Sequence, residues 1–213
     1  MNDMRYTDLS SREYAELLSS SSPVPGGGGT AALCGALGCA LGQMVGSLTS
    51  GKKRYAAVEV ELQELMRSLE KMRAEMLALT ERDPEVFEPL SRAYGMPKET
   101  EEQAAEKARV MEECLVLAAS VPEDILALCG RAMDAIDRIA RIGSPLAVSD
   151  AGCAAALTRA AGEAAYLNIA VNAKYMKNRA FAEELSERSK EALAALRSHA
   201  DKVYANVAER IGG

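Results

Sequence analysis

The chain has 213 residues, of which 48% are hydrophobic and 26% are charged, as in an ordinary globular protein. This composition excludes a disordered chain, a collagen and a secreted disulfide scaffold. The formal charge of −6 argues against nucleic-acid binding, which needs a basic face. Aromatic residues make up only 4% of the chain, so aliphatic side chains and alanine must form the core. That core favours packed helices over a β-sandwich.

The cysteine and histidine content predicts neither disulfides nor a metal site. Five cysteines are an odd number, and no two of them are spaced C-x-x-C. Without a secretory signal at the start, they indicate buried thiols in a reducing cytoplasm. His199 is the only histidine, which disfavours zinc binding and a cysteine–histidine catalytic pair.

The N-terminal quarter of the chain predicts two helices joined by a glycine-rich loop. Ser10 and Glu13 form a capping-box pattern that opens the first helix. The loop from Pro23 to Gly29 is followed by an uncharged helix that ends near Thr49. Glycines at every fourth position of this helix would suit packing in a membrane. Because polar residues dilute the run and no second span exists, we expect a buried helix of a soluble bundle instead.

A basic turn, Gly51–Arg54, then leads into the clearest helical pattern of the sequence. Its apolar positions alternate in steps of four and three, which is the seam of a long packed helix: Val58, Leu62, Leu65, Leu69, Met72, Met76 and Leu79. Asp83 followed by Pro84 predicts either the N-cap of a new helix or a kink in one longer helix. Pro89 strengthens both readings.

The second half of the chain predicts further helices. Thr100 caps one that runs to about Ser120, Pro122 opens another, and Ser149 caps an alanine-rich helix. The last helix is expected from about Phe181 to Ile211. No segment alternates with a period of two, so we expect an all-α fold: a single-domain bundle over residues 1–213, with about seven helices, two of them long.

Three features could carry chemistry, and each has a structural alternative. The glycine-rich loop at a helix start would present amide groups to an anionic or carbonyl-bearing ligand, but it could also be a flexible turn. Asp83 and Asp150 lie beside turn residues, where N-capping alone would explain a carboxylate. Composition and periodicity therefore predict a soluble helical domain with a glycine-rich loop, a basic turn and two carboxylates beside turn residues.

Five elements in order resemble the cyclodeaminase family, which comprises the cyclodeaminase part of formimidoyltransferase-cyclodeaminase and the bacterial methenyltetrahydrofolate cyclohydrolases. The elements are Pro23–Gly28, Met44–Tyr55, Asp83 with Phe87 and Met96–Lys98, Ser149-Asp150, and Asn168–Asn172. The resemblance covers about Leu9 to Lys177. Two positions depart from the family pattern: Gly29 replaces a serine, with Thr30 as a substitute hydroxyl, and Ser144 replaces an asparagine.

The resemblance implies an enzyme that acts on the one-carbon unit of tetrahydrofolate. The expected activity is 5-formimidoyltetrahydrofolate cyclodeaminase, which closes the methenyl ring and releases ammonia. The alternative is methenyltetrahydrofolate cyclohydrolase, which gives 10-formyltetrahydrofolate. A non-catalytic folate carrier or a helical assembly subunit is the alternative of another class. No cofactor beyond the folate substrate is implied, and a formimidoyltransferase is a possible partner.

The resemblance also suggests roles for particular residues. Asp83 and Asp150 are the catalytic candidates for proton transfer, while Lys52 and Lys53 would neutralise the glutamate tail of the folate. The remaining candidates for folate binding are Pro25, Gly26, Gly27, Gly28, Thr30, Thr49, Ser149 and Asn172.

These candidates cannot all meet one ligand within a straight-helix monomer. Lys53 and Asp83 bracket a segment that is roughly 45 Å long as one helix. The glycine loop and the basic turn bracket the preceding helix, about 30 Å apart. Either a sharp kink folds the motifs together, or a homodimer or larger oligomer forms the site between chains.

Overall fold

A computed structural model describes residues 5–212 and contains helices as its only regular elements within that range. Six α-helices follow in order, with three short 3-10 turns between or before them: α1 Ser11–Leu18, α2 Gly27–Thr49, α3 Glu59–Tyr94, α4 Glu101–Ile142, α5 Val148–Tyr175 and α6 Arg179–Gly212. The prediction of an all-α fold is confirmed. The expected helix number, about seven with two long, is corrected to six, of which five exceed twenty residues.

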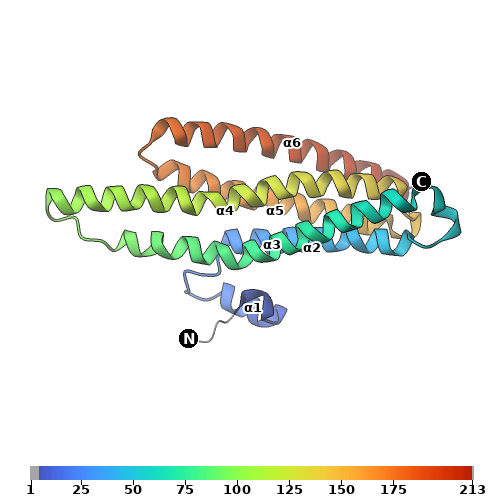
Figure 1. The fold of residues 1–213 in the computed structure, drawn as a ribbon, viewed down its shortest axis with the longest axis horizontal. Coiled ribbons are helices and arrows are strands. Elements are labelled where there is room, and N and C mark those ends of the chain that lie inside the picture. Colours follow the sequence, from blue (N-terminus) through green and yellow to red (C-terminus); the bar gives the residue numbers. More distant parts are fainter. Residues whose placement is uncertain (1–4, 213) are drawn as a thin grey trace.

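The five long helices run side by side along the bundle (Figure 1). Helices α2 and α5 pack together behind α3 and α4, and α6 covers α4 and α5 on the remaining side. Helix α1 lies beside the bundle, and the 3-10 turn before it, Tyr6–Asp8, is held by the Glu81 carboxylate of α3, which accepts the amide protons of Tyr6 and Thr7. Both predicted capping boxes are present, at Ser10 and at Thr100.

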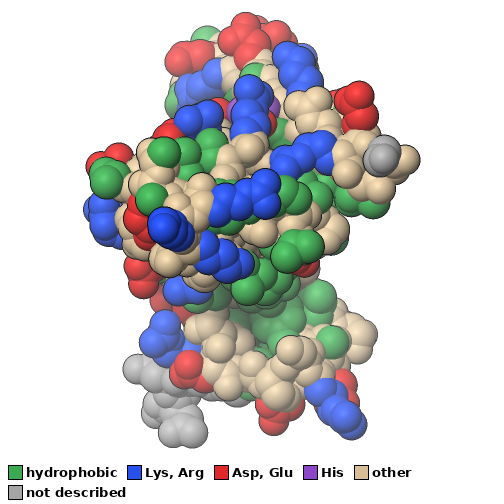
Figure 2. Space-filling view, turned by 90° about the vertical axis from the view of Figure 1, so that its right-hand side faces the viewer, with side chains coloured by type: hydrophobic (Ala, Val, Ile, Leu, Met, Phe, Trp, Pro, Cys, Tyr) green, Lys and Arg blue, Asp and Glu red, His purple; other side chains and the backbone are tan. Residues whose placement is uncertain are grey.

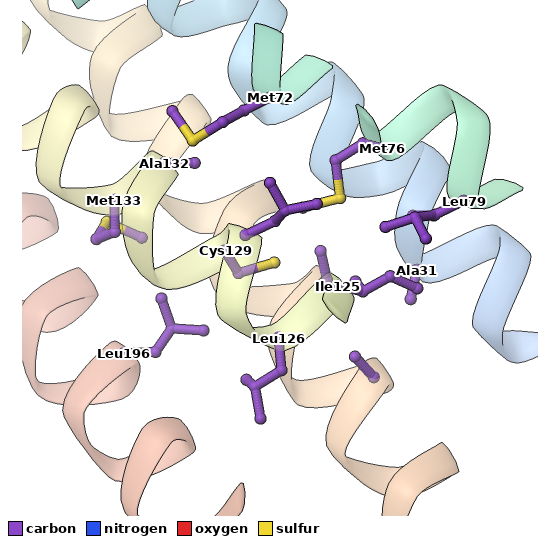
Figure 3. Close-up of a cluster of buried hydrophobic side chains, with 14 of the residues drawn as sticks. Ala31, Met72, Met76, Leu79, Ile125, Leu126, Cys129, Ala132, Met133 and Leu196 are labelled. Atoms are coloured by element: carbon purple, nitrogen blue, oxygen red, sulfur yellow. The ribbon is translucent and has the colours of Figure 1, made fainter. Parts of the chain in front are cut away.

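The helix seam predicted in α3 faces the core. Met72, Met76 and Leu79 point toward α4, where Met72 lies beside Ala132 (Figure 3). Burial of such side chains contributes about 1.5–3 kcal/mol each and is the main driving force for this packing. The core cluster draws residues from α2 through α6.

Helix α2 is long and apolar enough to span a membrane, and half of it is buried among the other helices. Its glycines are contact points within the chain: a Cβ at Gly38 would collide with Thr158 of α5, and one at Gly46 would collide with Met66 of α3. Because α2 lies between α3 and α5, its apolar, glycine-rich composition is explained by packing within the bundle.

Two predicted helix starts are wrong, for identifiable reasons. Pro122 does not open a helix but lies inside α4, where only the carbonyl of Ala118 loses its usual partner. Ser149 is not an N-cap: the 3-10 turn Pro145–Ala147 leads directly into α5, which begins at Val148. Asp83 likewise lies inside a continuous α3, so of the two readings at Asp83-Pro84 the single longer helix holds.

The expectation that all five cysteines are buried is also corrected. All five thiols are free, but Cys153 is exposed on α5 and Cys34 is half-buried.

Candidate functional site

A cavity of about 250 Å³ lies where the glycine loop meets α3, α4 and α5. It is lined by Pro23, Val24, Gly26, Gly27, Gly28, Asp83, Val86, Phe87, Ala118, Pro122, Asn168, Val171 and Asn172. Larger grooves exist, such as one of about 560 Å³ between α3 and α4, but the cavity at the glycine loop is the one lined by the predicted site residues. Its walls combine apolar side chains with the polar groups of Asp83, Asn168 and Asn172, and small-molecule sites usually hold such a mixture.

Among residues 5–212, Asp83 is the only charged residue that lines this cavity. Its Oδ2 accepts the amide proton of Gly29 at 2.7 Å, at the start of α2. Burial raises the pKa of the Asp83 carboxyl above its ordinary value of 3.8, and the Gly29 N–H, which favours the ionised form, offsets part of this rise. A carboxyl with a raised pKa holds a proton more readily than an ordinary aspartate, which suits it to proton transfer.

The second glycine of α2 makes room for this carboxylate. A Cβ at Gly28 would lie 2.6 Å from Cγ and 2.8 Å from Oδ2 of Asp83, and closer still to Oδ1. No side chain fits at that position without moving the carboxylate. The glycine loop therefore leaves the space that the Asp83 carboxylate occupies, and it also forms a wall of the cavity.

Two asparagines one turn apart on α5 face the opposite side of the cavity. The Asn168 side chain donates to the carbonyl of Ala164 at 2.9 Å, and the Asn172 side chain donates to the carbonyl of Asn168 at 2.9 Å. Their NH₂ groups are thus held by backbone, and the amide oxygens remain acceptors without a donor in residues 5–212. Asn172 was predicted as a site residue, whereas Asn168 was missed. The i, i+4 spacing, which places both on one helix face, was the available signal.

A proline shapes the wall between the asparagines and α4. Pro122 has no N–H, so the carbonyl of Ala118 four residues earlier is released from the helix ladder. The side chain of Asn172 donates to that carbonyl at 3.3 Å. The irregularity inside α4 therefore helps to orient a cavity residue.

Other predicted residues near the loop support it from behind. The Thr30 hydroxyl donates to the carbonyl of Gly26 at 2.8 Å and pairs with the Tyr14 hydroxyl at 3.3 Å. Thr30 does not line the cavity, and neither does Pro25, which is a buried residue of the loop itself. The hydrogen bonds of Thr30 hold the loop at Gly26.

The remaining predicted site residues lie at the opposite end of the bundle. There α2 ends, α5 begins, and Lys and Arg side chains spread over the face (Figure 2). Lys52, Lys53 and Ser149 are exposed, and Asp150 is half-buried in the first turn of α5. Gly51 adopts a φ of 74°, which favours glycine, and Glu59 accepts its amide proton at 3.0 Å to fix the turn.

Thr49 joins the elements at this end from a fully buried position. Its hydroxyl donates to the carbonyl of Val45 at 2.7 Å and accepts the amide proton of Ser144 at 2.8 Å. The structure therefore brings the predicted residues together as two groups at the two ends of α2. Its 23 residues separate the groups by about 33 Å.

Comparison with known proteins identifies the family of the chain. Residues 10–191 match the family model described as formiminotransferase-cyclodeaminase. The chain belongs to this family. It is 38% identical over 198 residues to the methenyltetrahydrofolate cyclohydrolase of Methylorubrum extorquens, covering 93% of this chain and 95% of that protein.

Two further relatives carry the other activity in their names. The formimidoyltransferase-cyclodeaminase of Mus musculus is 28% identical over 95% of this chain, which spans 38% of that longer protein. The crystal structure of formiminotetrahydrofolate cyclodeaminase from Thermotoga maritima superimposes with a TM-score of 0.80 at 28% identity, covering 97% of this chain and 98% of that one. The predicted family resemblance is confirmed.

Among residues 5–212, no group of three or more His, Cys, Asp or Glu side chains is placed to hold a metal ion.

Proposed function

We propose that this protein catalyses a reaction at the one-carbon bridge between N5 and N10 of tetrahydrofolate, with Asp83 as the proton-transfer group. The observation that carries the proposal is the Asp83 carboxyl, which faces a cavity at the glycine loop of a family whose named members perform this chemistry. The identity of 38% over nearly the full length of both chains favours the cyclohydrolase reaction. Cyclodeamination, which the motifs alone placed first, is the second candidate because of the full-length structural match.

In the cyclohydrolase reaction, water attacks the cationic methenyl carbon and forms a C–O bond. The ionised Asp83 accepts the proton that the water releases, and it also stabilises the cationic substrate through its negative charge. The tetrahedral carbon then collapses, the bond from this carbon to N5 breaks, and N5 takes the proton back from Asp83. As the carbon–oxygen double bond forms, the remaining hydroxyl proton is released to solvent, so the products are neutral 10-formyltetrahydrofolate and H⁺, and atoms and charge balance without a redox partner.

In cyclodeamination, Asp83 also accepts and returns a proton, but between different atoms of the substrate. N10 attacks the formimidoyl carbon on N5, Asp83 accepts the N10 proton, and the departing amine receives it as ammonia leaves. Both reactions pass through a tetrahedral carbon and need one carboxyl that cycles between its two protonation states. Such a group contributes roughly a 10²–10⁴-fold effect. We expect no metal or redox cofactor in either reaction.

Binding follows from the cavity walls. The flat pterin would lie against Gly26–Gly28, where the absence of side chains permits close approach. The amide oxygens of Asn168 and Asn172 would accept hydrogen bonds from the donor edge of the ring. No Lys or Arg lines this cavity in residues 5–212, so the carboxylates of the folate tail find no cation there.

The missing cation supports a site that two chains share. Lys52 and Lys53 of a second copy would meet the folate tail, accompanied by Thr49, Ser149 and Asp150 of that copy, if its basic end lay at the glycine-loop end of the first. The protein would then act as a homodimer or as part of a larger homo-oligomer. We place it in the cytoplasm, and a formimidoyltransferase would be its partner if cyclodeamination is the activity.

The assay is the absorbance of methenyltetrahydrofolate near neutral pH. Accelerated loss of supplied methenyltetrahydrofolate, beyond its spontaneous hydrolysis, indicates cyclohydrolase. Its appearance from 5-formimidoyltetrahydrofolate with release of ammonia indicates cyclodeaminase. Gly130→Ala is the matched active control, because a Cβ at Gly130 contacts nothing within 4 Å. Calorimetric binding of folate without turnover of either substrate would overturn the enzyme assignment in favour of a carrier.

A further inference from the structure

The chain that precedes α2 forms an N-terminal arm, residues 6–26, which packs only thinly against the bundle. Figure 1 shows its helix α1 beside the bundle, set apart from the five long helices. Of the eight residues of α1, Tyr14 alone is buried. Because an element with few buried contacts opens locally at low cost, specific polar contacts must hold the arm in place.

Glu81 of α3 anchors the outer end of the arm. Its two carboxylate oxygens accept the amide protons of Tyr6 and Thr7 at 3.0 and 2.8 Å. Hydrogen bonds to an ionised acceptor are roughly twice as strong as neutral ones. A glutamine offers one acceptor oxygen and an NH₂ group, so it could not hold both amides.

Tyr14 anchors the middle of the arm to α2 through a directional chain of hydrogen bonds. The Thr30 hydroxyl has one proton, which it donates to the carbonyl of Gly26 at 2.8 Å. It must therefore accept from the Tyr14 hydroxyl, which lies 3.3 Å away. Burial raises the pKa of the Tyr14 phenol above its ordinary value of 10.0, so the phenol is protonated at neutral pH and can donate.

The carbonyl held in this way belongs to the N-cap of α2. Gly26 has no side chain that could cap the helix, and the next three residues are also glycines. Such a turn frays unless outside groups fix it, because glycine loses the most conformational freedom on ordering. The hydrogen bond from Tyr14 through Thr30 fixes the turn on one side. The Gly29 amide, which donates to the Asp83 carboxylate at 2.7 Å, fixes it on the other.

We propose that Tyr14 is a positioning residue of the candidate site, which acts on Asp83 through the first turn of α2. Tyr14 does not line the cavity, so its effect must pass through Thr30. The arm also supplies the cavity wall at Pro23 and Val24, so undocking of the arm would displace this wall as well. The role in catalysis rests on the proposed function, whereas the ordering of the turn rests on these contacts alone.

Hydrogen exchange tests the ordering of the turn without any substrate. Tyr14→Phe keeps the buried ring and removes only the hydroxyl, and the amides of Gly29 and Thr30 should then exchange about 3- to 10-fold faster. Thr30→Val should give the same change, whereas Thr30→Ser, which keeps the hydroxyl, should not. Tyr204→Phe, at an exposed tyrosine of α6, is the matched control and should exchange like wild type. Unchanged exchange in Tyr14→Phe, or equal exchange in the valine and serine variants, would overturn the proposal.

Limited proteolysis tests the docking of the arm. Trypsin can cut α1 at the exposed Arg12 only when the helix opens, so the cutting rate follows the open fraction. Tyr14→Phe and Glu81→Gln should each be cut there about 3- to 10-fold faster than wild type. Tyr204→Phe should be cut at the wild-type rate. Equal cutting of all four proteins would overturn the anchoring role of both contacts.

Kinetics then test the effect on Asp83. Tyr14→Phe should lower kcat about 3- to 10-fold. It should also move the acid limb of the kcat/KM profile up by roughly half a pH unit, because the Gly29 N–H, which favours the ionised carboxylate, is bound less of the time. Within the described part of one chain no other titratable side chain lines the cavity, so this limb reports Asp83.

A loss of stability alone would not move that limb. A Tyr14→Phe protein with wild-type kcat and an unmoved acid limb would overturn the positioning role. A wild-type chain that turns over neither folate contradicts only the proposed function, because the exchange and proteolysis results do not depend on turnover.

Discussion

Replacing Gly28 with alanine should displace the Asp83 carboxylate without removing any polar group from the chain. The new Cβ would lie 2.6 Å from Cγ of Asp83, where ordinary contacts begin near 3.4 Å. The carboxylate must therefore move by about 1 Å, which is enough to cost a misplaced catalytic group roughly 10²-fold in rate. We expect kcat to fall by about that factor.

The same displacement has a cost in stability. Moving the carboxylate breaks its hydrogen bond from the Gly29 amide, and a bond to a charged group contributes about 1.5–3 kcal/mol. Overpacking adds about 1–3 kcal/mol, while alanine in place of glycine in a helix returns about 1 kcal/mol. The free energy of unfolding should therefore fall by about 2–5 kcal/mol.

Urea denaturation and the methenyltetrahydrofolate assay measure the two effects. Gly130→Ala is the control, and it should gain about 0.5–1 kcal/mol with unchanged turnover, because nothing lies near its Cβ. In an Asp83→Ala background the clash is gone, so Gly28→Ala should cost little further stability. A Gly28→Ala protein with wild-type stability and turnover would refute the claim that the absence of a side chain at Gly28 positions Asp83.

Three further substitutions probe the two ends of the bundle. Asp83→Asn should lower kcat by about 10²–10⁴-fold. Because the pKa of Asp83 is raised in the folded state, the wild type should lose stability relative to this variant as pH rises from below 3.8 through the folded pKa, which denaturation at several pH values measures. Asp150→Asn should fold normally and lose turnover, and full activity would leave Asp150 a structural role only. Thr49→Val should cost about 1–3 kcal/mol in a melting experiment, because the buried amide of Ser144 loses its acceptor; an unchanged melting temperature would argue against that bond.

The helical fold could be predicted because periodicity and capping act locally. The seam of α3 and the boxes at Ser10 and Thr100 are short-range signals, and they appear in the structure as predicted. Pro122 misled the prediction because a proline removes one hydrogen bond, and that loss ends a helix only when nothing else compensates. Here Asn172, fifty residues away in sequence, donates to the released carbonyl of Ala118.

Part of the candidate site could also be predicted from local sequence signals. The loop glycines and Asp83 are marked by unusual residue types, and the structure places them together. Asn168 belongs to the Asn168–Asn172 element of the family resemblance but was not predicted as a site residue, because an asparagine on a helix is ordinary until packing turns it toward a cavity. Leu37, Leu48 and Leu167 look the same in sequence as core positions, so only the packed structure shows that they remain exposed.

Subunit mixing tests the shared site most directly. Lys53→Ala and Asp83→Asn should each be nearly inactive at low substrate concentration, since one lacks the tail contact and the other lacks the proton-transfer group. After verified exchange of equimolar chains, half of the dimers are hybrids, and each hybrid has one intact site. About one quarter of wild-type activity should therefore return. Activity that stays at the level of the separate variants despite exchange would contradict a folate site built from two chains.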